Sequence, residues 1–410
     1  MEFNAKDILT TLTGYGNYYN QHRAIPSIKD GLKPSQRKVL YAASKLKLKA
    51  GKETKKADLL VGSAVEIYQH GRNSLEGTII RMGQEFKMGN TLFSIEGNYG
   101  SQATITAPDA GAAATRYLGI TTTTLGDELL KSIKTGTAVY IPHQEDPISL
   151  WLNIPGFLLF AQRGIGVGTA TSTPAFTLDS VKKVTEKLVE QEGVITSKEL
   201  AEILVPTIEQ QPILINKEDM EEIFSQKGKK KSFRYRAQFT PNGTTLRVTN
   251  FPFGVSPSMV IKQISEAIEI VPSFKSIVKV QDTSSVNADG STNVSLELYL
   301  KNKNHVNQLI QDLRAKTSLE STQSVNLTLV NKDGLAKEDT YPEALKEWFE
   351  IYKEESTKVL KGEIKELDRK IFRTQASALA VDNIDLVVEI IKGSLNRQDA
   401  IKNLSEKLNT

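Results

Sequence analysis

The chain of 410 residues is 39% hydrophobic and 24% charged, which is typical of a globular protein, and its length predicts two or three domains because a single core seldom grows beyond about 250–300 residues. The absence of cysteine excludes disulfides and thiolate metal sites, and the four histidines lack the short spacings of a zinc site. A formal net charge of +4 is too small to identify a nucleic-acid partner by itself.

Two helices are predicted near the N-terminus. Residues 5–20 have amphipathic spacing, and Pro34 suits the first turn of a second helix. In that second helix apolar residues recur on one face, while Arg37 and Lys45 share another. Ten Lys and Arg but only two acidic residues occur between positions 29 and 56. This clustering suits the neutralisation of DNA phosphates, although a solvated basic face has the same composition.

The next region ends in a candidate nucleophile. Residues 63–83 predict a helical stretch with His70 near its start, and residues 93–117 predict a loop region rich in glycine and alanine. The loop region ends in Arg116-Tyr117. A tyrosine cleaves DNA reversibly when its phenolate attacks a phosphodiester, and a neighbouring arginine neutralises the charge that grows on the phosphate. Most tyrosines only pack in a core or lie on a surface, so the dipeptide alone does not establish this chemistry.

The remainder of the chain has two textures. Segment 150–335 mixes strands with helices such as residues 256–270, which predicts a separate α+β domain. The predicted strands are residues 233–239, 245–250, 294–300 and 325–330. The glycine-rich segment 164–168 predicts a tight turn rather than a dinucleotide-binding loop. From Pro342, apolar residues recur every three or four positions for nearly forty residues, which predicts a helix of roughly 55 Å.

Four segments resemble, in order and in spacing, the cleavage subunit of type II DNA topoisomerases, the DNA gyrase A and topoisomerase IV A family. They are RAIPSIKDGLKPSQRKVLYA from residue 23, VGSAVEIYQHGRNS from residue 61, EGNYGS from residue 96 and AAATRY from residue 112. The resemblance covers nearly the whole chain and is closest to T-even-like phage members. It implies an α+β multidomain fold with an N-terminal helical arm (1–24), a winged-helix domain with the catalytic tyrosine (25–148), a tower domain (149–338) and a coiled-coil arm (339–410).

The resemblance also implies a role for individual residues. It assigns catalysis to Tyr117, Arg116, Arg23 and His70, and DNA binding to Lys33, Arg37, Lys38, Lys45 and Thr173. Tyr117 would become joined to a DNA 5′-phosphate. Gln69 leaves His70 without the second histidine of bacterial members. Thr173 stands where relatives insert an isoleucine between bases, so weaker bending, or bending by a neighbour such as Phe176, is expected.

The same resemblance predicts the partners. The sequence contains no P-loop and no Asp-x-Asp cluster. Mg²⁺ and ATP are therefore expected on partner subunits, with this chain acting on double-stranded DNA as a homodimer within a heteromeric, ATP-dependent complex. No recognisable DNA-wrapping domain is found, which favours relaxation and decatenation over supercoiling. Relatives continue through a returning helix and a dimer-forming domain, so the exit gate is expected to be truncated, supplied by another polypeptide, or absent.

Two alternatives remain at this stage. The chain could be a non-catalytic winged-helix DNA-binding protein, in which Tyr117 would be a core residue. It could also be a tyrosine recombinase or type I topoisomerase, which would form a 3′-phosphotyrosine, although nothing resembles that catalytic layout. The most apolar stretch, residues 148–161, falls short of the roughly 18 apolar residues that a membrane-spanning helix needs. A cytoplasmic protein is therefore expected, in the host cell if the chain is phage-encoded.

Overall fold

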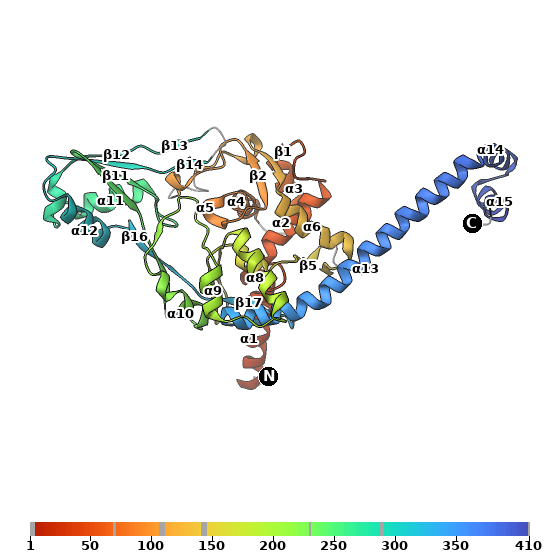
Figure 1. Cartoon of the computed structure of the whole chain (residues 1–410), viewed down its shortest axis with the longest axis horizontal. Helices are drawn as coiled ribbons and strands as arrows, with labels where there is room; N and C mark the ends of the chain where they lie inside the picture. The colour runs from red at the N-terminus through yellow and green to blue at the C-terminus, as the bar shows by residue number, and fades with distance from the viewer. Residues whose placement is uncertain are drawn as a thin grey trace. The chain divides into compact units, whose positions relative to one another are not determined.

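The computed structural model describes residues 5–68, 71–105, 111–140, 146–228, 231–287 and 291–408 (Figure 1). The chain forms two compact units, a main unit (Met1–Ser356) and a C-terminal unit (Thr357–Thr410). Both contain helices, and the small sheets lie in the main unit, so the fold is a mixed α/β arrangement. No helix among the described residues is long and apolar enough to cross a membrane.

The two N-terminal helices occur where the sequence predicts them. Helix α1 (Ala5–Tyr19) continues into a π-helical turn, η1 (Asn20–Ala24), and α2 (Pro34–Lys45) begins at its proline. The apolar face of α2 enters the core. Val39, Leu40 and Ala43 have no exposed surface there. Periodicity was sufficient for this prediction because the apolar face of a helix repeats about every 3.6 residues.

The prediction of a single helical stretch over residues 63–83 is wrong. The structure has two helices, α3 (Ala57–Ile67) and α4 (Arg72–Met82). They are separated because Tyr68 adopts an extended backbone, with φ −126° and ψ 98°, and because α4 takes Gly71 as its N-cap. His70 lies between the two helices, outside the described residues.

A short sheet also replaces the start of the expected loop region. Strand β3 (Gly119–Thr122) pairs antiparallel with β1 (Lys55–Lys56) on one side and with β2 (Phe93–Glu96) on the other. Strand β2 was missed because its four residues gain their stability from pairing with β3, which is distant in sequence. The loop expected over residues 93–117 therefore begins only after Glu96.

The glycine-rich segment forms the predicted tight turn. Strands β6 (Gln162–Ile165) and β7 (Ala170–Thr173) make a hairpin, and the Gly166 N–H donates to the Thr169 carbonyl at 2.8 Å. A Cβ on Gly164 would lie 2.3 Å from the Ala24 carbonyl oxygen, so only glycine fits there.

The predicted α+β region contains two main sheets. One has the order β10-β11-β15-β12 and the other β16-β9-β8. Their strands are β8 (Ile213–Leu214), β9 (Ser232–Arg236), β10 (Gln238–Asn242), β11 (Thr245–Thr249), β12 (Ile277–Asp282), β15 (Leu296–Leu300) and β16 (Glu320–Ser324). Helices α11 (Pro257–Ala267) and α12 (Val306–Lys316) belong to the same region.

The single strand expected over residues 233–239 is wrong, because β9 and β10 belong to different sheets. Ala237 separates them. It is fully buried, and its N–H donates to the Leu319 carbonyl at 2.8 Å. The strand expected over residues 325–330 is shortened to β17 (Thr328–Val330), which pairs with β18 (Ala336–Glu338).

The remaining elements, other than the long helix described next, lie in both units. They are α5 (Glu85–Met88), η2 (Gln102–Thr104), η4 (Thr115–Tyr117), α6 (Thr124–Thr135), β4 (Val139–Tyr140), β5 (Pro147–Ser149), α7 (Gly156–Leu159), α8 (Leu178–Glu190), α9 (Ser197–Ile203), η5 (Lys217–Asp219), α10 (Met220–Ser225), η6 (Pro272–Ser276), β13 (Ser285–Val286), β14 (Thr292–Asn293), α14 (Ile384–Gly393) and α15 (Arg397–Leu408).

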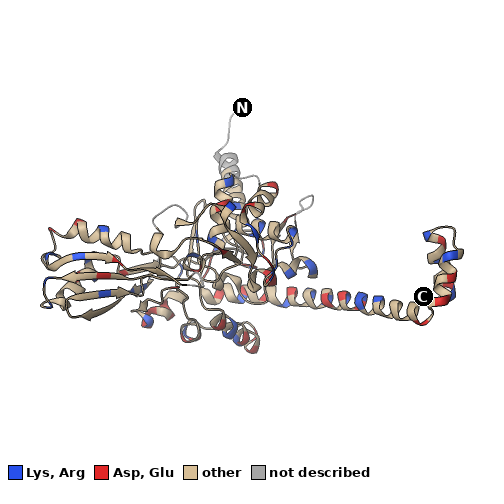
Figure 2. Ribbon diagram, turned by 90° about the horizontal axis from the view of Figure 1, so that it is seen from above, with Lys and Arg blue, Asp and Glu red and all other residues tan. Residues whose placement is uncertain are grey.

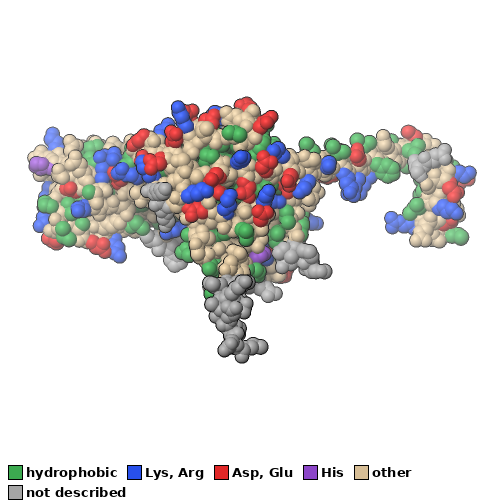
Figure 3. Space-filling view, turned by 90° about the horizontal axis from the view of Figure 1, so that it is seen from below, with side chains coloured by type: hydrophobic (Ala, Val, Ile, Leu, Met, Phe, Trp, Pro, Cys, Tyr) green, Lys and Arg blue, Asp and Glu red, His purple; other side chains and the backbone are tan. Residues whose placement is uncertain are grey.

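The long helix is confirmed as α13 (Tyr341–Asp382), with 42 residues. Its first turns are anchored in the main unit, where the Trp348 ring stacks on Trp151 with centroids 5.8 Å apart. Further along, charged residues of both signs follow the helix (Figure 2). Acidic and basic side chains are also mixed over the main unit on the face shown in Figure 3. Charge alone therefore does not mark a site on that face.

Candidate active site

Tyr117 lies at the end of the 3₁₀ turn η4 and is 64% exposed. Its N–H donates to the Ala114 carbonyl at 2.9 Å, and the next residue, Leu118, is fully buried. The hydrogen bond and the buried Leu118 thus fix the backbone at Tyr117, while its phenol ring is exposed to solvent. A core role for this tyrosine, as the non-catalytic alternative required, does not fit that exposure.

The glycine-rich segment EGNYGS supports the Tyr117 turn. The Ala113 N–H donates to the Asn98 carbonyl at 2.8 Å. Gly97 has a φ of +100°, and a Cβ there would lie 3.2 Å from Leu118 Cδ2. A larger residue would therefore be strained and would crowd Leu118. The sequence predicted only the order of the EGNYGS and AAATRY segments. In the structure these two segments are in contact.

Arg116 lies against the nucleophile candidate. Its guanidinium carbon is 4.7 Å from the centroid of the Tyr117 ring. Hydrogen bonding to the Tyr117 side chain, followed by the charges of Tyr117 and Asp58, raises the pKa of Arg116 above its usual value. Arg116 is therefore a permanent cation, so a phenolate formed at Tyr117 would have its counter-charge already in place.

Asp58 links this turn to α3, although the sequence pattern did not single it out. The Thr115 hydroxyl donates to the Asp58 carboxylate at 3.1 Å, and Arg72 forms an ion pair with the same carboxylate. Arg72 also contacts Glu76 at 2.9 Å. The available signal was an acidic residue in the first turn of a helix, a common stabilising feature that does not indicate a site. Arg116, Tyr117, Thr115 and Asp58 together are called the Tyr117 cluster below.

A second group of side chains, called the Arg23 cluster, consists of Tyr68 and the nearby Arg23, His22 and Lys38. Lys38 Nζ lies 4.9 Å from the centroid of the Tyr68 ring and 2.9 Å from the Asp146 carboxylate. Burial raises the pKa of Tyr68, and the charge of Arg23 partly offsets that rise. Burial, together with the charges of Lys38 and Arg37, lowers the pKa of His22, so this imidazole is neutral at pH 7.

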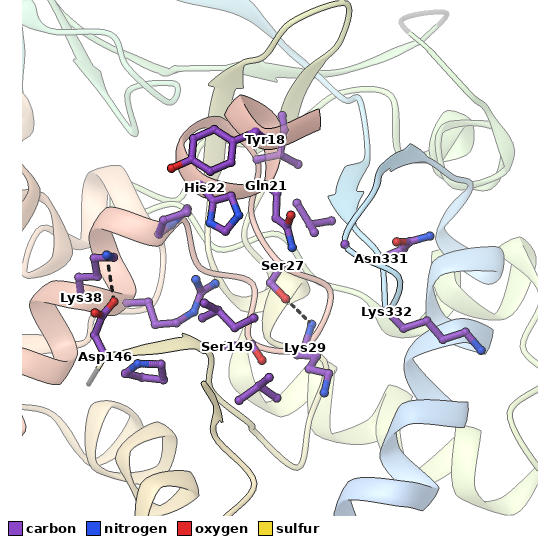
Figure 4. Close-up of a pocket in the computed structure, with 18 of the residues that line it drawn as sticks. Tyr18, Gln21, His22, Ser27, Lys29, Lys38, Asp146, Ser149, Asn331 and Lys332 are labelled. Carbon is purple, nitrogen blue, oxygen red and sulfur yellow. Dashed lines mark hydrogen bonds and ion pairs between the residues drawn. The ribbon is translucent and has the colours of Figure 1, made fainter. Parts of the chain in front are cut away.

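Three members of the Arg23 cluster, His22, Lys38 and Tyr68, line a cavity of about 320 Å³ (Figure 4). Tyr18 and His22 project from the end of α1 and from η1 toward it, with ring centroids 4.6 Å apart. Lys29 is also at the wall, where it forms an ion pair with Glu355 at 3.0 Å. The wall contains both signs of charge, because Asp146 and Asp333 line it together with Lys29 and Lys38. Arg23 is exposed beside the Tyr19 ring.

Lys33 is the N-cap of α2, and its ammonium group donates to the Arg163 carbonyl at 2.5 Å. Burial, together with the charge of Arg81, lowers the pKa of Lys33 to about 8. The ammonium form still predominates at pH 7, but it is held among other cations. Lys45 is exposed at the end of α2, with Nζ 5.3 Å from the centroid of the Tyr41 ring.

The structure differs from the expectation at Arg37. This side chain is 3% exposed and makes two contacts with Asp30, at 2.6 and 3.0 Å, and one with the Leu32 carbonyl at 2.7 Å. Asp30 also accepts from the Leu32 and Leu150 N–H groups. A buried carboxylate needs a paired cation, so this guanidinium is committed to the interior and does not reach a surface phosphate.

The structure also differs at Thr173. Successive side chains of a strand point to opposite faces, and in β6 this leaves Arg163 and Ile165 exposed, with Ile165 81% exposed. Thr173 faces the interior, 4% exposed, where its hydroxyl accepts from the Gln162 N–H at 3.3 Å. Phe176, the neighbour considered as a substitute, is fully buried. Neither residue is presented for insertion between bases.

The Tyr117 and Arg23 clusters are attached to different ends of α3. Asp58 is in the first turn of α3, and Tyr68 follows its last residue, so the two clusters are at opposite ends of a helix roughly 15 Å long. His70 cannot be placed because it is outside the described residues. Over the described ranges, no three His, Asp or Glu side chains converge in a way that could hold a metal ion.

Comparison with known proteins gives consistent matches along the chain. A family model for the A subunit of DNA gyrase/topoisomerase IV matches residues 23–410. The A subunit of DNA topoisomerase 4 from Salmonella typhimurium is 28% identical over 389 residues, which cover 92% of this chain and 50% of that relative. The Staphylococcus epidermidis protein of the same name is 25% identical, covering 98% and 50%. The A subunit of DNA gyrase from Clostridium acetobutylicum is 25% identical, covering 94% and 46%. The chain spans about half the length of these curated relatives.

Proposed function

The chain belongs to the A-subunit family of DNA gyrase and topoisomerase IV, and we propose that it is the DNA breakage and reunion subunit of a type II DNA topoisomerase. The observation on which this rests is the exposed Tyr117 with the Arg116 guanidinium against its ring. The phenolate oxygen attacks a phosphodiester, forming a 5′-phosphotyrosine bond while the 3′-oxygen leaves and takes up a proton. The reverse attack by the 3′-hydroxyl reseals the strand and releases Tyr117.

The other site residues have proposed roles that follow from their surroundings. Arg116 stabilises the charge that develops on the phosphate and on the phenolate oxygen. Arg23 and His70 complete the surroundings of the scissile phosphate. Lys33, Lys38 and Lys45 bind the DNA backbone. To do so, Lys38 must break its ion pair with Asp146 and contact a DNA phosphate instead. Arg37 and Thr173 are given no DNA contact.

A homodimer acting on double-stranded DNA is part of this proposal. Tyr117 is tied to the first turn of α3 through Thr115 and Asp58, and Arg23 acts on Tyr68, which follows the last turn. These two attachment points are roughly 15 Å apart along the helix, farther than one phosphate spans. A site that uses both residues is therefore completed by Arg23 of a second copy.

The domain organisation is proposed with the boundaries given above. Helices α2, α3 and α4 beside the sheet β1-β3-β2 support a winged-helix domain over residues 25–148, preceded by the helical arm. The two larger sheets support a tower over 149–338. A coiled-coil arm over 339–410 is supported by exposed apolar residues at three- and four-residue spacing on α13. They are Leu360, Ile364, Leu367 and Ile371.

Mg²⁺ and ATP are proposed to be bound by a partner subunit. Among the described residues of this chain, no three His, Asp or Glu side chains are grouped so that they could hold a metal ion, and the sequence has no Asp-x-Asp cluster. When bound next to the Tyr117 cluster, the ion would stabilise charge on the departing 3′-oxygen. Arg116 and Tyr117 of this chain would position the phosphate for that step.

The test mixes two variants of the full chain with the partner subunit, Mg²⁺ and plasmid DNA, followed by denaturant. Tyr117→Phe alone should give no covalent adduct, and Arg23→Ala alone should give about a hundredfold less than wild type. Co-expression of the two yields mixed dimers in which one site is intact, so nicked plasmid should reappear. Tyr140→Phe, which changes another exposed tyrosine, is the matched control and should cleave normally. Full adduct formation by Tyr117→Phe would overturn the proposed function, and mixed dimers without nicks would overturn the shared site.

A further inference from the structure

Asp58, in the first turn of α3, joins two other segments of the chain. Its carboxylate accepts from the Thr115 hydroxyl at 3.1 Å and forms an ion pair with Arg72. Thr115 begins the turn η4 that contains Tyr117, and Arg72 is the first residue of α4. One carboxylate therefore ties the start of the Tyr117 turn to the start of a second helix.

A second contact from α3 holds the other end of the same turn. The Ala57 N–H donates to the Leu118 carbonyl at 2.9 Å. Ala57 and Asp58 thus hold the residues immediately before and immediately after the Arg116-Tyr117 pair. Between these two anchors the Tyr117 side chain is exposed, so its direction depends on how the turn is held.

The Asp58 contacts are partly exposed to solvent, which limits what they add to stability. The Asp58 side chain is 44% exposed and that of Arg72 is 49% exposed. Exposed ion pairs contribute little to the free energy of unfolding, because water screens the charges and the side chains lose freedom. The chain after Tyr117 is held independently, since Leu118 is fully buried and β3 pairs with two strands. The Asp58 contacts are therefore expected to matter for the orientation of the turn rather than for folding.

The carboxylate also has an electrostatic effect on the site. Hydrogen bonding to the Tyr117 side chain and the charge of Tyr117 raise the pKa of Arg116, and the charge of Asp58 adds to that rise. Asp58 therefore helps to keep the guanidinium beside the turn. The same negative charge repels DNA phosphates, and Arg72 offsets this repulsion.

We propose that Asp58 is a positioning residue for DNA cleavage. Through Thr115 it holds the turn in the orientation in which the Tyr117 oxygen and the Arg116 guanidinium face the same phosphate. Asp58 itself needs no contact with the DNA. A small misplacement of a nucleophile lowers the rate of the chemical step much more than it lowers binding, so the effect is expected in cleavage. The inference rests on the proposed function, since it takes Tyr117 as the nucleophile.

The first test compares two variants that each remove one carboxylate from Arg72. Asp58→Ala should cleave about tenfold more slowly than wild type in single-turnover reactions with saturating plasmid, partner subunit and Mg²⁺. Its affinity for a fluorescent duplex should not fall, because a charge that repels phosphate is lost. Glu76→Ala is the matched control, since Glu76 also contacts Arg72, at 2.9 Å. It leaves the Thr115 contact in place and should cleave as fast as wild type.

The Thr115 hydroxyl gives an independent measure with its own conservative variant. Thr115→Val removes the hydroxyl but nearly keeps the shape of the side chain, and it should slow cleavage as much as Asp58→Ala does. Thr115→Ser keeps the hydroxyl and should cleave at the wild-type rate. Because both residues act through one contact, the variant with both Asp58→Ala and Thr115→Val should be no slower than the slower single variant.

The outcomes distinguish this inference from the proposed function. If Asp58→Ala cleaves at the wild-type rate while Tyr117→Phe forms no adduct, Asp58 does not position the turn and the proposed function stands. If Asp58→Ala loses duplex affinity or thermal stability along with cleavage, or if Thr115→Ser is as slow as Thr115→Val, the role of the carboxylate is a general structural one and the positioning assignment is wrong. If wild type forms no adduct, the proposed function fails and this inference fails with it.

Discussion

The Tyr117 turn and the start of α2 use the same side chain in opposite ways. Arg116 is exposed and lies against a phenol ring, whereas Arg37 is 3% exposed and is held by the fully buried Asp30. Both arginines belong to segments that resemble the same family. The difference shows that a basic residue in a functional motif either acts on the substrate or holds the motif in shape, and that burial decides which.

The largest expected effect is on stability, at Arg37. Arg37→Ala leaves the Asp30 carboxylate buried without a cation, which should lower the free energy of unfolding by about 3–5 kcal/mol. Chemical denaturation of the purified chain measures this. A variant as stable as wild type but with weaker DNA binding would show that Arg37 acts on DNA after all, and the contrast with Arg116 would disappear.

The reverse pattern is expected at Arg116. Arg116→Ala should leave the free energy of unfolding nearly unchanged, because exposed charge contacts contribute little. The rate of DNA cleavage should fall by roughly a hundredfold, or about 3 kcal/mol, since the lost cation acts mainly in the transition state. Single-turnover cleavage in the presence of Mg²⁺ and the partner subunit decides the matter. Loss of stability with normal cleavage would place Arg116 in the same class as Arg37.

The smallest effect is expected at Lys33. Its side chain is half-buried, and its exposure is therefore between that of Arg116 and that of Arg37. Its folded-state pKa of about 8 is below the usual value of 10.5, so burial disfavours the ammonium form and folding stability should rise as the pH rises from about 8 toward 10.5. Binding a DNA phosphate needs the proton. Duplex affinity should therefore fall by about tenfold between pH 7 and pH 9.

Lys33→Arg is the matched control for this pH dependence, because arginine stays charged over the whole range. Its duplex affinity should be constant between the two pH values. An equal decline in Lys33→Arg would assign the pH dependence to another group.

Much of the fold followed from the sequence where the signal was local. Helical periodicity gave α1, α2 and α13 close to their observed bounds. The short strand β2 and the break near Ala237 were missed because both depend on pairing with residues far along the chain. The separation of α3 from α4 was missed because an extended backbone at Tyr68 leaves no mark in the apolar pattern.

The candidate site was predictable to a similar degree. The motif order pointed to Tyr117, and its exposure beside Arg116 is compatible with that role. Spacing could not reveal that Arg37 is buried, because its partner Asp30 is identified only by the folded geometry. Asp58 escaped notice for the same reason, since its contact with Thr115 joins residues 57 positions apart.

The most direct test of the proposed chemistry is the identity of the covalent bond. Wild-type chain with its partner subunit, Mg²⁺ and plasmid DNA is trapped with denaturant, digested with nuclease and protease, and analysed by mass spectrometry. We predict a nucleotide attached through its 5′-phosphate to the peptide that contains Tyr117. A link through a 3′-phosphate, or attachment to any other residue, would contradict the proposal.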